Sequence, residues 1–240
     1  MKRSVLAIFA IFALLAAVLV NAQTAPAASA QKSTSGGDLN SVLARMNANA
    51  GTFKSAQADF EFETYQQVVD EKDLQKGHIY FRKTGKGVDA AFNITSPAPK
   101  QVVFDGKYVT MCEPKIDQCT QRDVSKNKVA VESFLSLGFG ASGTDLEKSY
   151  DVTLGGWEPV EGIQTARLEL VPKDEKMRQT YSKIILWIDP EKNVMLQQKF
   201  IEPSKDYRLT RYSNMKLNSK LPDDAFRLKT SASTKIVKSQ

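Results

Sequence analysis

Apolar and polar residues alternate with a period of two through most of the chain after residue 55, a pattern typical of β-strands with one apolar face. Phe60 and Phe62 alternate with glutamates, and Ile79 and Phe81 alternate with polar residues. Further runs of this kind lie at 89–94, 101–104, 107–111, 150–154, 165–171, 183–188, 194–201 and 208–217. Short turns join them, which indicates antiparallel pairing, and about ten twisted strands curl toward a barrel.

A different spacing precedes the strands. Asp38 is a candidate helix N-cap, and apolar residues then recur three and four positions apart on one helical face: Leu39, Val42, Leu43 and Met46. The pattern therefore predicts an amphipathic helix before the sheet.

The strand pattern lapses again in the middle of the chain. Residues 129–139 form a short, strongly apolar segment, and residues 142–148 have the composition of a second short helix, capped by Ser142 or Thr144. Because the apolar segment is unsuited to water, it must lie on the sheet or cover its opening. The predicted fold is mainly β with some α: an incomplete, unclosed antiparallel β-barrel of about ten strands, lidded by short α-helices.

The first residues have the layout of a secretory signal peptide. Lys2 and Arg3 precede an unbroken apolar run at 5–20, and residues 20–22 give a small-x-small cleavage pattern. A second such pattern lies at 28–30. The apolar run is shorter than the roughly 20 residues of a membrane-spanning helix. We therefore expect export with removal of residues 1–22, or cleavage as late as residue 30, in preference to a membrane anchor.

The rest of the chain predicts one domain. Residues 23–37 are rich in small residues and read as a flexible leader, 38–229 as a single domain, and 230–240 as a C-terminal tail. Lys2 and Arg3 account for two of the six net positive charges, so the mature chain keeps +4. The basic residues form no dense cluster with interleaved aromatics, which argues against nucleic acid as a partner.

The chain has two cysteines, Cys112 and Cys119, on either side of a Pro-containing turn. In an oxidising compartment such a close pair is expected to form a structural disulfide. A metal site would need more ligands, and His78 is the only histidine. His78 falls opposite Ile79 and Phe81 in the alternation, so we expect it on the outer surface. With no phosphate loop, nucleophile elbow or metal-ligand cluster, the sequence does not indicate an enzyme.

Several segments, in order along the chain, resemble the outer-membrane lipoprotein carrier family (LolA-like proteins). Each is short, but together they follow the family's first strand, second strand, Asp-Gly hairpin and terminal Phe motif. They are Ser55-Ala-Gln-Ala-Asp-Phe60, Gly77-His-Ile-Tyr-Phe-Arg-Lys83, Ser96-Pro97, Gln101-Val-Val-Phe-Asp-Gly106, Tyr108-Val-Thr-Met111 and Leu221-Pro-Asp-Asp-Ala-Phe226.

The resemblance implies a periplasmic carrier whose apolar cavity receives the acyl chains of lipoproteins, or of other lipids, and moves them from the inner to the outer membrane. It also implies an inner-membrane release transporter and an outer-membrane receptor as partners, with no cofactor, and we expect a monomer. The alternative is a periplasmic sensor or regulatory module of the same fold. Such regulators usually carry an additional C-terminal domain, which we do not expect here.

One position departs from the family. There the second strand ends in Arg-Pro, and the arginine hydrogen-bonds the lid shut. The matching residue here is Lys83, followed by Thr84 and preceded by Arg82. Lysine lacks the planar donor fork of arginine. Lys83, with Arg82 beside it, is therefore the candidate lid latch, either a weaker one or part of a different lid control.

The alternation nominates the residues that bind the acyl chain, provided that no strand is shifted by one residue. The same residues could instead form a close-packed core, which is the usual fate of an apolar strand face. The candidate cavity wall comprises Phe60, Phe62, Ile79, Phe81, Ala90, Phe92, Ile94, Val102, Phe104, Val109, Met111, Leu168, Leu170, Ile184, Leu186 and Ile188. The candidate lid residues are Phe134, Leu135 and Leu137.

Overall fold

The computed structural model describes residues 37–137, 139–189, 191–192 and 194–239, apart from the side chains of residues 129, 130, 133 and 134. These residues belong to one compact unit, Thr34–Gln240. The predicted signal peptide and all of the predicted leader except Gly37 lie outside them.

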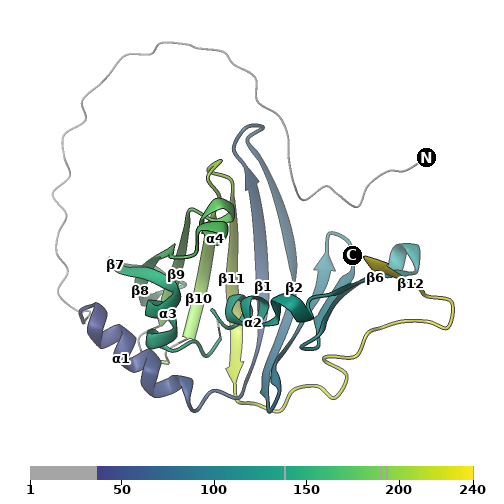
Figure 1. Ribbon diagram of the computed structural model, residues 1–240, viewed down its shortest axis with the longest axis horizontal. Coiled ribbons are helices and arrows are strands. Elements are labelled where there is room, and N and C mark those ends of the chain that lie inside the picture. Colours follow the sequence, from purple (N-terminus) through teal and green to yellow (C-terminus); the bar gives the residue numbers. More distant parts are fainter. Residues whose placement is uncertain (1–36, 138, 190, 193, 240) are drawn as a thin grey trace, which may run out of the picture. The chain divides into compact units, whose positions relative to one another are not determined.

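Twelve strands form one sheet in the order β12-β6-β5-β4-β3-β2-β1-β11-β10-β9-β8-β7 (Figure 1). The order does not close on itself, which confirms the predicted mainly β, unclosed architecture. The strands are β1 (Ser55–Gln66), β2 (Glu71–Thr84), β3 (Gly87–Ser96), β4 (Lys100–Phe104), β5 (Tyr108–Glu113), β6 (Gln118–Asp123), β7 (Tyr150–Val160), β8 (Ile163–Pro172), β9 (Lys183–Asp189), β10 (Val194–Ile201), β11 (Tyr207–Leu217) and β12 (Lys235–Ser239).

In the described part of the chain, four α-helices accompany the sheet: α1 (Leu39–Ala50), α2 (Lys128–Ser136), α3 (Gly143–Ser149) and α4 (Glu175–Thr180). Short 3-10 turns, η1 (Pro114–Ile116) and η2 (Ser125–Asn127), follow β5 and β6. The side chain of Asp38 accepts a hydrogen bond from the Ser41 amide, and that of Ser142 accepts one from the Asp145 amide. These bonds confirm both predicted caps. Each cap satisfies a backbone donor that the first helical turn leaves unpaired.

Strand β1 joins the two halves of the sheet. It pairs with β2 on one side and β11 on the other, and the register places Phe60 opposite both Gly77 and Tyr212. Every described pairing is antiparallel except that of β12, which runs parallel to β6. The sequence predicted neither β12 nor α4, because five residues of tail and six of helix carry too little periodicity to be recognised.

The helices divide the inner face of the sheet into two regions. Helix α1 packs on α3, α3 on β7, and α4 on β8, whereas α2 packs on β3 (Figure 1). The predicted stripe of α1 is buried at Val42, Leu43 and Met46. Under α1 and α3, the sheet and helices therefore form a continuous close-packed core.

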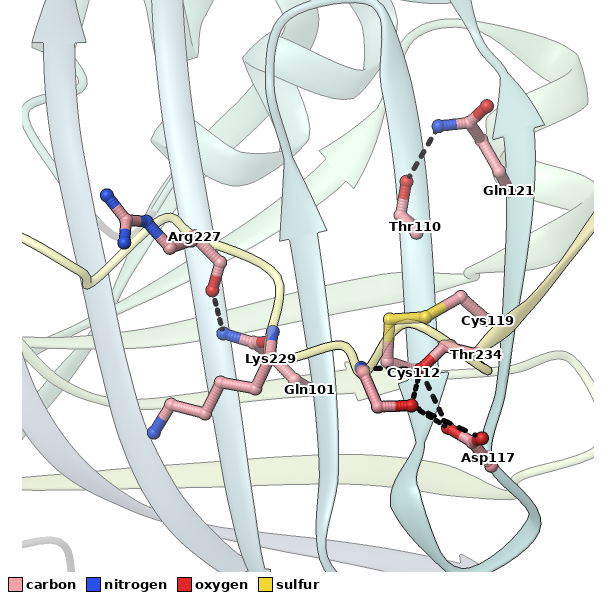
Figure 2. Close-up of a disulfide and its surroundings, with 10 residues drawn as sticks. Gln101, Thr110, Cys112, Asp117, Cys119, Gln121, Arg227, Lys229 and Thr234 are labelled. Carbon is pink, nitrogen blue, oxygen red and sulfur yellow. Dashed lines mark hydrogen bonds between the residues drawn. A yellow bond between two sulfur atoms is a disulfide. The ribbon is translucent and has the colours of Figure 1, made fainter.

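The outer face of β3–β5 is covered by the C-terminal segment. The Gln101 side chain donates to the Arg227 carbonyl and accepts from the Lys229 amide, at 3.0 and 2.9 Å (Figure 2). Cys112 and Cys119 are directly opposed on β5 and β6 and form the predicted disulfide. Cys112 pairs with Gln101 in the register, so the disulfide lies on the outer face, beneath this segment.

Candidate functional site

A cavity of about 370 Å³ lies between the inner face of the sheet and the end of α2 with the segment that follows it. Strands β1 to β4 supply one wall, and β10 and β11 supply the other. Its size falls within the roughly 300–1,000 Å³ range of small-molecule sites. The lining residues are Phe60, Phe62, Gln75, Ile79, Phe81, Phe92, Ile94, Val102, Leu135, Phe139, Tyr181, Gln198, Phe200, Arg208, Thr210 and Tyr212.

Part of the predicted wall lies in this cavity. On β1 to β4 the alternation points the chosen side chains inward, and the register keeps them on one face, since Phe92 is opposite both Ile79 and Val102. The predicted residues that line the cavity are Phe60, Phe62, Ile79, Phe81, Phe92, Ile94, Val102 and, from the lid, Leu135.

The other predicted wall residues do not line the cavity. Those on β8 and β9 face inward, but α1 and α3 cover that region, so they belong to the closed core: Leu168, Leu170, Ile184, Leu186 and Ile188. Ala90 and Phe104 are buried beside the cavity, while Val109 and Met111 are half-buried on β5. The physical reason is that alternation fixes which face a side chain occupies, whereas the helices decide which stretch of that face stays open.

Sequence reasoning missed the second wall. Phe200 on β10 and Tyr212 on β11 face the cavity, with Thr210 and Arg208 at the next inward positions of β11. Their spacing of two could have revealed them. This face mixes polar with apolar residues, which weakens the strand pattern, and Tyr181 comes from the loop after α4, which no strand pattern reports.

Two hydrogen-bonded polar pairs contribute to the cavity lining. The Gln198 amide donates to the Tyr212 hydroxyl at 2.8 Å, and burial raises the pKa of Tyr212, so this phenol stays neutral at physiological pH. The Arg208 guanidinium donates to the Tyr181 hydroxyl at 2.7 Å and forms an ion pair with Glu202 at 2.9 Å. The site thus combines a largely apolar wall with a few fixed polar groups.

The lid side of the cavity is tightly packed. Phe139 stacks on Phe81, with 5.6 Å between the ring centroids, and contacts Tyr212 edge-on at 5.2 Å. Leu137 is buried at 3% exposure. Phe134 belongs to α2, but its side chain lies outside the described part of the structure.

Lys83, the candidate latch, contacts α1 and the segment after α2. Its Nζ donates to the carbonyl of Ala50 at the end of α1, at 3.0 Å, and to that of Gly140 after α2, at 3.4 Å. The ammonium also lies over the Phe53 ring, 5.6 Å from the centroid. One side chain of β2 therefore contacts both segments that flank the lid.

Arg82 faces the other way. It pairs with Asp89 at 2.8 Å and lies 4.2 Å from the ring centroid of Phe226, in the C-terminal segment. Because they are adjacent on a strand, the two candidate latch residues point to opposite faces of the sheet. Of the two, Lys83 is on the inner face, with α1 and the segment after α2.

A second pair of contacts holds α2 to the β2–β3 turn. Lys128 Nζ donates to the Lys86 carbonyl at 2.7 Å, and the Glu132 carboxylate accepts from the Val88 amide at 3.3 Å. Both bonds involve backbone groups of the turn, so its side chains gave no signal of this contact in the sequence.

His78 is exposed on the outer face, as predicted, and its Nδ1 lies 2.6 Å from Asp59. A hydrogen bond from Asn214, together with His78, lowers the pKa of Asp59. Within the described residues no three His, Cys, Asp or Glu side chains come together in a way suited to a metal ion. Nor does any described helix have the length and apolar character needed to cross a membrane.

The structure is an unclosed sheet with helices over an apolar cavity, and comparison with known proteins identifies its family. The family described as outer membrane lipoprotein carrier protein LolA matches residues 51–229. The chain therefore belongs to the LolA family. No curated protein shows a significant match to the chain.

Solved structures share the fold at low sequence identity. MucB is 16% identical, with a TM-score of 0.52 over 82% of this chain and 64% of MucB, so the chain spans less than two thirds of that protein. An uncharacterised conserved protein from Thermus thermophilus is 12% identical, with a TM-score of 0.52 over 83% and 98% of the two chains. The lipoprotein LppX of Mycobacterium tuberculosis is 11% identical, with a TM-score of 0.50 over 77% and 99%.

Proposed function

We propose that this protein is a periplasmic carrier that shelters acyl chains of lipoproteins or other lipids in its cavity on their way from the inner to the outer membrane. The family description names such a carrier, and the predicted signal peptide supports export. In this proposal an inner-membrane transporter loads the protein and an outer-membrane receptor unloads it. The protein itself catalyses no reaction.

The observation that carries the proposal is the shape and chemistry of the cavity. On β2 the lining runs from Phe81 to Gln75, which is roughly 20 Å at about 3.4 Å per residue. One leaflet of a bilayer holds its acyl chains within half of a hydrocarbon core of about 30 Å. The cavity is therefore long enough for one acyl chain and the group that bears it.

The energetics favour such a guest. Each methylene that leaves water contributes about 0.8 kcal/mol, so a lipid chain gains on the order of 10 kcal/mol before the costs of ordering. Aromatic and aliphatic side chains provide most of the lining. A flexible acyl chain can contact them in many conformations, because apolar contacts have no fixed geometry. An acyl carrier needs this combination of strong burial and low specificity for chain shape.

The test is displacement of an apolar fluorescent probe, such as 1-N-phenylnaphthylamine, by a triacylated lipopeptide. The variant Ile94→Trp adds bulk to the cavity wall, and Ile163→Trp makes the same change at an exposed site on β8. We expect Ile94→Trp to weaken binding of both ligands at least tenfold, with Ile163→Trp unchanged. Absence of lipopeptide binding, or equal affinities in both variants, contradicts the proposal. Co-purification with an inner-membrane protein and no lipid would favour the regulatory alternative.

A further inference from the structure

Among its described lining residues, the cavity carries a charged side chain at one end only. Its inner end is formed by Phe81 and Phe139, which are 1% and 4% exposed. At the other end stand Gln75 and Arg208, which are half-buried, and beyond them residues 71–74 of β2 are exposed. An acyl chain that enters here places its hydrocarbon against the phenylalanines and its head at this polar end.

Arg208 is the only charged residue among those that line the cavity within the described part of the chain. It is held from two sides, by the Tyr181 hydroxyl at 2.7 Å and by Glu202 at 2.9 Å. A guanidinium has five N–H donors in a rigid plane. Two of them serve these partners, and Arg208 itself lines the cavity, where a guest can meet the remaining donors.

A guest made only of hydrocarbon fits this end poorly. It would strip water from the guanidinium without returning a hydrogen bond, and desolvating an ionic group without compensation is costly. A guest with an oxygen acceptor at the same depth restores the bond. Arg208 therefore favours a guest with an acceptor over a bare chain.

Glu202 decides which acceptor is preferred. The carboxylate of Glu202 balances the charge of Arg208, so the pair has no net charge. The carboxylate of an ionised fatty acid bound to Arg208 would lie close to that of Glu202 and be repelled by it. A carbonyl of an ester or amide accepts from the guanidinium without that repulsion. Such carbonyls occur where an acyl chain is covalently attached to glycerol or to a peptide.

We infer that the cavity selects acyl chains linked through an ester or amide, with the linking carbonyl hydrogen-bonded to Arg208 and the chain pointing toward Phe81. This inference rests on the proposed function and names its substrate class. It assigns Arg208 a recognition role and Glu202 a positioning role that also excludes free fatty acids.

The experiment compares three ligands in three proteins at pH 8, where a fatty acid is ionised. The ligands are methyl dodecanoate, dodecanoate and the probe 1-N-phenylnaphthylamine, which has no carbonyl. Probe affinity is measured directly, and the two others by competition. The proteins are the full chain without its signal peptide and its variants Arg208→Met, which keeps an apolar stem of similar length, and Glu202→Gln.

Arg208→Met should weaken ester binding about tenfold more than probe binding, as expected for loss of a charge-assisted hydrogen bond that the ester makes and the probe does not. Glu202→Gln should strengthen dodecanoate binding about tenfold and leave the ester unchanged. Each prediction compares the affinity of one ligand between two proteins, so the different water solubilities of the ligands cancel.

The outcomes separate this inference from the proposed function. If the wild-type protein binds neither probe nor ester, the carrier proposal itself fails. If both bind but Arg208→Met weakens them equally, or Glu202→Gln leaves dodecanoate unchanged, the carrier proposal stands and selection by Arg208 and Glu202 is refuted. An unchanged circular dichroism spectrum and unfolding midpoint show that each variant has folded.

Discussion

Lys83→Met should loosen the lid. The substitution keeps the apolar stem and removes the ammonium, and with it the hydrogen bonds to Ala50 and Gly140. A hydrogen bond contributes about 0.5–1.5 kcal/mol to stability. Because Lys83 is exposed and its bond to Gly140 is long, we take the two bonds together to contribute about 1 kcal/mol. That loss corresponds to about a fivefold larger opening equilibrium of the segment over the cavity.

Native-state hydrogen exchange with mass spectrometry measures this opening directly. Peptides covering 139–149 should exchange about five times faster in Lys83→Met, and dissociation of the apolar probe should accelerate in proportion. Peptides from β8 and β9 should not change, because neither hydrogen-bond partner of Lys83 lies on those strands. Lys83→Arg should retain protection, since its guanidinium can donate to both carbonyls.

Lys86→Met is the matched control. It removes a lysine three residues further along the chain, in the β2–β3 turn, where the backbone carbonyl of Lys86 is bonded to Lys128 of α2. Unchanged exchange of 139–149 in Lys83→Met, or an equal increase in Lys83→Met and Lys86→Met, would refute the latch reasoning. An equal increase across β8 and β9 would do the same, since it would report general destabilisation.

Two further predictions concern the outer face. Replacing Cys112 and Cys119 by Ser should lower the free energy of unfolding in urea by about 2–3 kcal/mol, the entropic value of so short a loop. Probe affinity should stay the same because the disulfide faces away from the cavity, and a weaker probe affinity would contradict this placement. Hydrogen bonds from Thr234, Ser233 and Ser231 lower the pKa of Asp117 below its ordinary value of 3.8. The stabilisation that these hydrogen bonds to the Asp117 carboxylate give the folded state is therefore complete above pH 3.8. It is lost as the pH falls through the lowered pKa. Backbone protection of β12, corrected for intrinsic exchange, should thus persist at pH 5 and fall only below about pH 4. Asp117→Ala should lose that protection at every pH, and a wild-type loss already at pH 5–6 would contradict the assignment.

Much of the first cavity wall could be predicted from the sequence. Phe60 and Phe62 are two positions apart on a strand, so they must share a face, and the same holds for Ile79 and Phe81. The N-caps, the Asp-Gly hairpin and the disulfide were equally accessible, because each depends on residues within a few positions of one another. Local chemistry and a period of two are sufficient for such features.

The second wall and the latch partners needed the tertiary structure. Arg208 faces the cavity because β11 pairs with β1, far away in the sequence, and its neighbour Tyr181 comes from a loop. Lys83 was nominated only through the family resemblance. Its partners are the carbonyls of Ala50 and Gly140, and backbone groups carry no trace in the sequence of what binds them.

By itself, the sequence determined most of the strands, the inner faces of β1 to β4 and of β8 and β9, the first helix and the disulfide. Only the tertiary structure decided that Leu168 and Ile184 fill a closed core while Phe62 and Phe92 line a cavity, although all four follow the same alternation. The reason is that alternation is a property of one strand, whereas an open space depends on which helix lies over it. Helices α1 and α3 pack closely over one half of the sheet, and the segment after α2 leaves room over the other.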